Sequence, residues 1–375
     1  MSNKKILYIR QQKIPQSLTK KIQQLDSKYD YESMLKVLAL TSQQSFYNRA
    51  GDNTLPFCFD NQIIDISIPA GDCSFKKTFE EITDQRCMEL LEQCNDRPWI
   101  VSWSGGIDST VILASLLKNA SKSQLDNVIV SCNNLSVLEN PVFFHNHVLP
   151  NFKIINGTSP HLEKFLDNHY IIDGNPADLL QGSGLGLLAQ NSGLDLGQPW
   201  QQQSGPLNDF LSDQIGKTAA NWLYSRISQN ILSLSDHTLI DTLADWFWWI
   251  NFNWKWVGDC WYIVSCQDLD NITPCFTSFK NWYDTEDYQQ WSINYGRYSL
   301  VNDGPSPGDY KKSSKQYIYD YDGNQYYYRF KTKTHSTARV ELQQPWLCML
   351  NDGTTLSAEQ DLDLILELLP AHLNL

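Results

Sequence analysis

Residues 104–109 read Ser-Gly-Gly-Ile-Asp-Ser, so hydroxyl groups, two glycines and a carboxylate lie within six consecutive positions. An apolar stretch at 99–103 precedes them and another at 110–117 follows, which predicts a strand, a tight loop and a helix start. Glycine lets the backbone approach a ligand closely, and a helix N-terminus attracts phosphate. The alternative is an ordinary Ser/Gly turn. The flanking pattern favours a phosphate cradle, whose expected members are Trp103, Ser104, Gly105, Gly106, Ile107, Asp108, Ser109 and Thr110.

A second run of polar residues follows another apolar stretch. Residues 170–172 are Tyr-Ile-Ile, and 173–179 read Asp-Gly-Asn-Pro-Ala-Asp-Leu. Both polar runs come at the carboxyl ends of expected parallel strands, and ligands of such sheets bind at that edge. Mg²⁺ bound to phosphates usually takes one or two protein carboxylates. Asp108 and Asp178 are therefore expected on the same edge of the sheet, where their number would suit such an ion; the alternative for Asp178 is a turn or helix N-cap residue.

The elements that must position these residues alternate along the chain. Strands are expected at 99–103, 127–132, 152–156 and 170–173, and helices at 109–120, 138–149 and 160–169. Repeated strand–helix units of this length predict an α/β fold. Its core should be a parallel twisted sheet with right-handed crossovers and helices on both faces.

We expect three consecutive sections. Residues 1–97 are an α+β section with strands at 6–9 and 62–68 and a helix at 78–91. Residues 98–206 form the nucleotide-binding core and end in a Gly-, Ser- and Gln-rich stretch, 182–206, expected to be a mobile loop or lid. Residues 207–375 are largely helical. Their aromatic run at 246–261 is expected to be buried, with a stacking surface as the alternative, and 317–328 is expected to be a β-hairpin.

Both polar runs resemble signatures of a known superfamily. Residues 104–109 resemble the SGGxDS loop of the PP-loop ATP pyrophosphatases, a group with an adenine nucleotide alpha hydrolase-like (HUP-like) fold. Residues 170–179 resemble the second signature of its asparagine synthetase and β-lactam synthetase branch. The resemblance implies that the loop grips the pyrophosphate end of ATP, that Asp108 and Asp178 bind Mg²⁺, and that AMP and pyrophosphate are formed. It also implies that Ser131, Cys132 and Gly174 line the nucleotide site.

The chain departs from that branch at several positions. Asn175 stands where the family has an acidic residue that takes part in amide formation, and Leu179 replaces the following Glu. Ser2 follows Met1 where the glutaminase half would carry its nucleophilic Cys, so an amine or ammonia donor is expected from elsewhere. The family also uses a late Lys against charge on the phosphates, for which Lys331 and Lys333 are the candidates.

Net charge, apolar runs and cysteine usage limit the classes of partner and the compartment expected for the chain. The net charge is −13 and the pI about 4.9, which argues against nucleic acid. Local basic patches around 311–315 and 329–333 are the exception. No apolar run reaches the roughly 18–20 residues of a membrane span, and no signal peptide is recognised. Nine scattered cysteines without a CxxC pair fit a reduced, cytoplasmic protein, and the His145-x-His147 pair is not expected to bind metal.

Three functions remain open from the sequence. The first is an ATP-dependent adenylating enzyme, a ligase that activates a carboxylate or amide oxygen of a small-molecule or peptide substrate for transfer to a nitrogen nucleophile. The second is a PP-loop enzyme that modifies a nucleobase or tRNA, similar to deazaguanine nitrile synthases or thiolases. These should show a four-Cys zinc cluster or a paired reactive Cys, and neither is visible. The third is a nucleotide-binding module without activity, against which Asp108 and Asp178 argue.

Overall fold

The structure is a computed structural model. The part of the chain that it describes comprises residues 6–9, 20–21, 23–24, 31–41, 49, 67–157, 162, 165–182, 184–234, 240–260, 277–299, 311–331, 346–350, 354–357, 361 and 364. The chain folds as two compact units, each built from separated stretches. Unit 1 comprises Met1–Ile68, Gly182–Ser265 and Gln343–Leu375, and unit 2 comprises Pro69–Gln181 and Cys266–Leu342.

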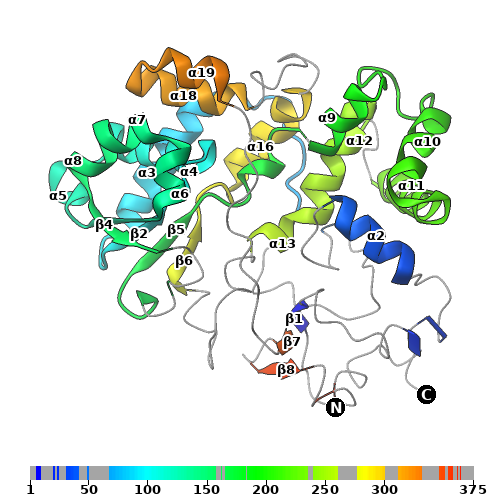
Figure 1. The fold of residues 1–375 in the computed structure, drawn as a ribbon, viewed down its shortest axis with the longest axis horizontal. Helices are drawn as coiled ribbons and strands as arrows, with labels where there is room; N and C mark the ends of the chain where they lie inside the picture. Colours follow the sequence, from blue (N-terminus) through cyan, green and yellow to red (C-terminus); the bar gives the residue numbers. More distant parts are fainter. Residues whose placement is uncertain are drawn as a thin grey trace. The chain divides into compact units, whose positions relative to one another are not determined.

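Unit 2 is built on a five-stranded sheet in which every neighbouring pair of strands is parallel. The strands are β2 (Trp99–Ser102), β3 (Val128–Cys132), β4 (Lys153–Asn156), β5 (Tyr170–Asp173) and β6 (Phe279–Asn281), in the order β4-β3-β2-β5-β6 (Figure 1). The central strand β2 pairs Ile100 with Ile129 of β3 and with Ile171 of β5. A parallel sheet with an α/β architecture is thus confirmed. Strand β6 was not anticipated, because three residues carry too little pattern.

The strand order reverses beside β2. From β2 the chain adds β3 and then β4 on one side, and it later adds β5 and β6 on the other. In open α/β sheets, ligands bind outside the carboxyl ends of the strands at the point where the order reverses. That point lies between β2 and β5. The two strands that flank it are the ones followed by the two polar runs.

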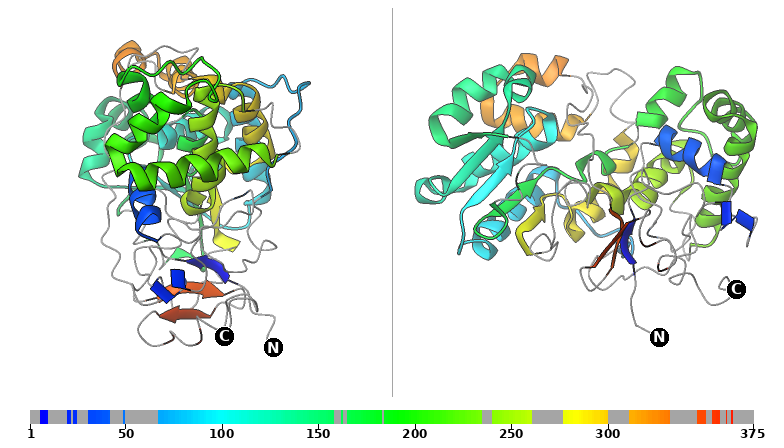
Figure 2. Two further views of the ribbon diagram at one scale, coloured as in Figure 1. Left: turned by 90° about the vertical axis from the view of Figure 1, so that its right-hand side faces the viewer. Right: turned by 60° about the horizontal axis from the view of Figure 1, so that its bottom comes forward.

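Helical segments connect and cover these strands. They are α3 (Phe79–Gln93), α4 (Ile107–Asn119), α5 (Lys122–Leu125), α6 (Asn134–Glu139), α7 (Pro141–Phe143), η2 (Phe144–Val148), α8 (Leu149–Asn151), η5 (Ala177–Leu179), α16 (Glu286–Asn294), η8 (Gly296–Tyr298), α18 (Lys312–Asp322) and α19 (Gln325–Phe330). Helix α4 joins β2 to β3, and α6 to α8 join β3 to β4. Helices α3 and α18 both pack against α4, and Figure 2 shows the same group from two further directions.

The segment 317–328 is helical, so the expected hairpin is wrong. Gly323, with φ +67°, ends α18 in the left-handed conformation, and its N–H donates to Tyr319 O. Asn324 then caps α19 through Tyr327 N–H at 3.0 Å. The Asp-Gly-Asn string therefore ends one helix and begins the next, since glycine at a helix C-terminus and asparagine at an N-cap are both favoured.

Unit 1 is mainly helical. Its helices are α2 (Tyr31–Thr41), α9 (Gly184–Asn191), α10 (Ser204–Ile215), α11 (Lys217–Leu232), α12 (Leu243–Trp249), η7 (Ile250–Lys255) and α13 (Trp256–Cys260). A small antiparallel sheet joins β1 (Ile6–Ile9), β7 (Trp346–Leu350) and β8 (Thr355–Ser357). The strand expected at 6–9 is confirmed. The aromatic rings between 246 and 256 are buried, as predicted, and Trp261 lies outside the described residues.

The three expected sections do not coincide with these units. The chain leaves unit 2 after Gln181 and returns at Cys266, so the supposed helical section supplies β6, α16, α18 and α19 to the sheet unit. Residues 182–206, expected to be a loop, contain α9 and the start of α10. The expected strand at 62–68 falls largely outside the described residues. Of the expected helix at 160–169, residues 165–169 are described and form turns, with the His169 N–H donating to Phe165 O at 2.9 Å, so the regular helix is not confirmed there. Within the described ranges, no helix is both long and apolar enough to cross a membrane.

Candidate functional site

The loop after β2 folds back on itself through its serines. Ser104 N–H donates to Ser109 Oγ at 3.1 Å, and the two serine Oγ atoms lie 3.1 Å apart. Gly106 N–H donates to Ser104 Oγ at 3.2 Å. Helix α4 begins at Ile107 with no side-chain cap, and the first N–H groups of a helix have no acceptor inside it. The loop and helix start thus form a compact, donor-rich turn at the carboxyl end of β2.

The two glycines of this loop have different roles. Gly105 has φ +78°, and a Cβ there would lie 2.1 Å from Ser136 O and 2.7 Å from Glu139 Cβ. Gly105 is therefore needed for the loop to pack against α6. A Cβ at Gly106 would meet only the Ser104 hydroxyl, at 3.2 Å, among the described atoms. Of the two, Gly106 is the position that leaves room for a ligand.

Trp103, expected in the nucleotide site, points into the core. Its indole N–H donates to Thr110 Oγ1 at 3.1 Å, and its ring stacks on Phe144. Its backbone N–H donates to Ser131 O at 2.9 Å, which continues the pairing of β2 with β3. Trp103 and Thr110 therefore support the loop from beneath, and their side chains are engaged with each other.

Asp108 and Asp178 lie together, and a residue that we did not predict joins them. Lys311 Nζ is 2.5 Å from both carboxylate oxygens of Asp108 and 2.6 Å from Asp178 Oδ1. The Lys311 side chain is 2% exposed, whereas Asp108 is 25% and Asp178 37% exposed. One buried ammonium thus bridges two carboxylates that open toward solvent.

Two further contacts, made by Tyr283 and Gly174, hold this triad, Asp108, Asp178 and Lys311, in place. The Tyr283 hydroxyl donates to Asp108 O at 2.9 Å. A Cβ at Gly174 would lie 3.3 Å from Asp108 Cβ, so the turn after β5 passes close against the start of α4. Lys311 has φ +54° and immediately precedes α18. Burial by itself lowers the pKa of Lys311, but the two carboxylates outweigh burial and raise it, so the ammonium stays charged.

Lys331, one of the two predicted lysines, lies away from this triad. Lys331 Nζ pairs with Glu139 Oε1, next to the position where Gly105 contacts α6, and Lys333 lies outside the described residues. Lys311 and Lys315 are buried, so the run 311–315 is not the solvent-exposed basic patch that the sequence suggested. The basic run was visible in the sequence. Its proximity to Asp108 was not, because some two hundred residues separate them.

The turn after β5 has no acidic side chain at positions 175 and 179. The Asp173 carboxylate accepts the Asn175 N–H at 3.0 Å and the Asn175 side-chain amide at 3.4 Å, and it is buried. Leu179 is fully buried. The two positions at which the branch that the sequence resembles carries acidic residues thus hold an amide that stabilises the turn and a core side chain.

The end of β3 provides a buried hydroxyl. Ser131 Oγ is buried and has no hydrogen-bond partner within the described part of the chain. Buried polar groups are nearly always satisfied, so this hydroxyl is suited to a ligand atom. Burial raises the pKa of the Cys132 thiol, and a buried protonated thiol is a poor nucleophile. Asn133 Oδ1 accepts Ser136 N–H at 3.0 Å and caps α6.

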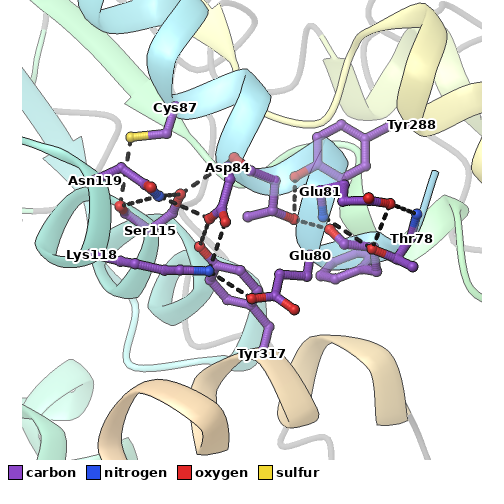
Figure 3. Close-up of polar contacts among 12 residues, drawn as sticks. Thr78, Glu80, Glu81, Asp84, Cys87, Ser115, Lys118, Asn119, Tyr288 and Tyr317 are labelled. Atoms are coloured by element: carbon purple, nitrogen blue, oxygen red, sulfur yellow. Dashed lines mark hydrogen bonds and ion pairs between the residues drawn. The ribbon is translucent and has the colours of Figure 1, made fainter.

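A polar network anchors α18, which begins directly after Lys311. Figure 3 shows Asp84 of α3 accepting a hydrogen bond from Tyr317 of α18 at 2.5 Å and one from Lys118 of α4 at 2.6 Å. Burial opposes ionisation, but the hydrogen bonds from Lys118, Tyr317 and Asn119 lower the pKa of Asp84. Burial and the adjacent Asp84 raise the pKa of Tyr317. A neutral phenol therefore donates to a carboxylate that joins three helices.

The carboxylate pair fits a divalent cation that is shared with a ligand. Across the described residues there is no group of three or more His, Cys, Asp and Glu arranged to hold a metal. Two carboxylates on one rim suffice where phosphate oxygens and water complete the coordination of Mg²⁺. His145 and His147 lie in the π-helical turn η2 and belong to no such group.

Comparison with known proteins does not assign the chain to a family. No protein-family model matches the chain, and a search of curated proteins finds no similar sequence.

Proposed function

We propose that this chain is an ATP-dependent adenylating enzyme that forms AMP and pyrophosphate. The observation that carries the proposal is the convergence of Asp108, Asp178 and Lys311 beside an uncapped helix start, at the point where the strand order reverses. The strand order and the loop after β2 also support a PP-loop, HUP-like fold. A carboxylate or amide oxygen would attack the α-phosphorus, and the bond to the β-phosphate oxygen would break.

The residues of this chain have separable tasks in that step. The start of α4 and the open face at Gly106 bind the phosphates through backbone N–H groups. Lys311 supplies a fixed positive charge where negative charge grows on the departing pyrophosphate. Asp108 and Asp178 would hold Mg²⁺, which neutralises phosphate charge when bound. The buried Ser131 hydroxyl, at the end of β3, would meet the adenine.

The second half-reaction joins the acyl group to nitrogen. An amine attacks the carbonyl carbon of the adenylate, the bond to the phosphate oxygen breaks, and AMP leaves with the electron pair. Asn175 and Leu179 supply no base for the amine proton. We therefore propose that the AMP phosphate or water takes up this proton. The amine or ammonia itself would come from a separate donor, because Ser2 stands where the glutaminase half would carry its nucleophilic Cys.

A nucleobase- or tRNA-modifying activity has less support. Thiolation needs a reactive cysteine, and Cys132, at the end of β3, is buried with a raised pKa. The four-Cys zinc cluster of a nitrile synthase is absent among the described residues.

Product analysis tests the proposal. The full chain is incubated with ATP, Mg²⁺ and pooled carboxylic acids, amines and peptides, and the nucleotides are separated by chromatography. We expect AMP and pyrophosphate from the unaltered protein and neither above background from Asp108→Asn. ADP and phosphate as the only products would contradict the proposal.

A further inference from the structure

We propose that Lys311 acts as the resident cation of the carboxylate pair in the ligand-free protein. A divalent metal would then enter only together with a polyphosphate that takes over the Lys311 ammonium. This inference rests on the proposed function, because it specifies how the metal and the nucleotide depend on each other at that site.

Geometry makes the ammonium and a metal ion exclude each other. Lys311 Nζ already contacts both oxygens of Asp108 and one of Asp178, at 2.5 to 2.6 Å. A divalent ion held by both carboxylates needs the same oxygens. Hard cations such as Mg²⁺ bind oxygen at about 2.0–2.1 Å, so the ion and the ammonium cannot both occupy the space between them.

Charge balance decides which cation is favoured. Two carboxylates and one ammonium carry a net charge of −1 in the ligand-free triad. A divalent ion that displaced the ammonium would take the Asp108 and Asp178 carboxylates away from Lys311, whose side chain is 2% exposed. Breaking a buried pair in this way is strongly unfavourable. A bare metal ion should therefore bind weakly.

A polyphosphate removes this penalty. Its oxygens at the start of α4 would lie beside the Lys311 ammonium and replace the carboxylates as the counter-charge. The metal then occupies the oxygens that the ammonium has left. Metal and nucleotide should thus raise each other's affinity by the same factor, as linkage requires.

Metal binding without turnover tests this inference. Mn²⁺ affinity is measured on the full chain by the electron paramagnetic resonance signal of free Mn²⁺, with and without α,β-methylene-ATP, which cannot be cleaved to AMP. We expect the unaltered protein to bind Mn²⁺ weakly alone and at least about tenfold more tightly with the analogue. Lys311→Gln should bind Mn²⁺ alone about tenfold more tightly, because like charges in proximity oppose each other.

The neighbouring residue supplies a matched control. Lys312→Gln removes the same charge from an exposed position next in the chain and should leave Mn²⁺ affinity unchanged. Lys311→Gln combined with Asp178→Asn should lose the tighter site, which locates the ion at the pair. Thermal unfolding shows whether each variant is folded. If Lys311→Gln does not fold, the Mn²⁺ affinity of the unaltered protein with and without the analogue still tests the inference.

The outcomes separate this inference from the proposed function. Tight Mn²⁺ binding by the unaltered protein without the analogue, or equal affinity in Lys311→Gln, would overturn the role of Lys311 even if AMP is formed. If the analogue does not bind at all, the proposed function fails. A tenfold gain in Lys311→Gln with Mn²⁺ alone would then still support Lys311 as the resident cation.

Discussion

At the scale of single residues, the triad of Asp108, Asp178 and Lys311 links electrostatics to stability. Its three charges are close enough that removing one changes the environment of the other two. Residues that act as a unit give non-additive losses of rate, whereas a buried charge stripped of partners gives a growing loss of stability. Loss of catalytic rate and loss of stability should therefore follow different patterns in a set of variants.

Asp108→Asn and Asp178→Asn should each lower the rate of AMP formation by orders of magnitude, and the double variant should be little slower than either. The free energy of unfolding should fall little in each single variant, because the remaining carboxylate still pairs with Lys311. It should fall by roughly 3–5 kcal/mol in the double variant. Denaturant unfolding measures this, and adding Lys311→Met should restore stability without activity. Additive losses of rate would show that the two acids do not act together.

Substitutions at the two loop glycines, Gly105 and Gly106, should separate an effect on stability from an effect on nucleotide binding. Gly105→Ala should lower the free energy of unfolding by more than about 2 kcal/mol, because φ is +78° and the new methyl meets Ser136 O. Gly106→Ala should cost about 1 kcal/mol or less, since Gly106 has φ −73°, but should weaken nucleotide binding. Calorimetric titration with α,β-methylene-ATP and denaturant unfolding measure the two effects. Equal nucleotide affinity in Gly106→Ala and the unaltered protein would move the phosphates away from this loop.

At the scale of elements, α18 depends on its hydrogen bond to α3 and α4. The Tyr317 hydroxyl donates to Asp84 at 2.5 Å, and Asp84 also pairs with Lys118. Because Lys311 directly precedes α18, this network positions the lysine without touching the carboxylate pair. The expected hairpin at 317–328 would have given no such attachment.

Tyr317→Phe should lower the free energy of unfolding by about 1.5–3 kcal/mol, the usual contribution of a hydrogen bond to a charged group. It should also lower the rate of AMP formation at saturating ATP more than it raises the KM for ATP, because a displaced Lys311 affects departing pyrophosphate most. Tyr319→Phe is the matched control: it removes a hydroxyl from the same helix, and its ring packs on Tyr328. A Tyr317→Phe protein that is less stable but has an unchanged rate would show a purely structural role.

At the scale of the whole molecule, each of the two units is formed by stretches that are not contiguous in the chain. The stretch between β5 and β6 leaves unit 2 and supplies most helices of unit 1. The segment after it returns to complete the sheet and to bring Lys311 to the strand ends. Composition predicted domain boundaries near 97 and 206, because a change in residue usage marks a change of local structure. These boundaries do not match the units, because composition carries no information on which distant stretches of chain pack together.

The sequence by itself determined the parts of the site that depend on local pattern. The loop at 104–109, the strand that precedes it and the helix that follows were predictable from neighbouring residues, and parallel strands place their carboxyl ends on one edge. The nearness of Asp108 and Asp178 follows from that rule. The burial of the aromatic run was also predictable, since large apolar rings gain most from leaving water.

Only the tertiary structure decided the rest. The position of Lys311 between two carboxylates, the contact of Gly105 with α6, and the place of β6 at the sheet edge all join residues far apart in the chain. A short strand and one lysine in a basic run carry no periodicity that could identify their partners. Those partners are set by which surfaces pack together, because the free energy of burying a charge or a strand edge depends on groups that local sequence does not contain.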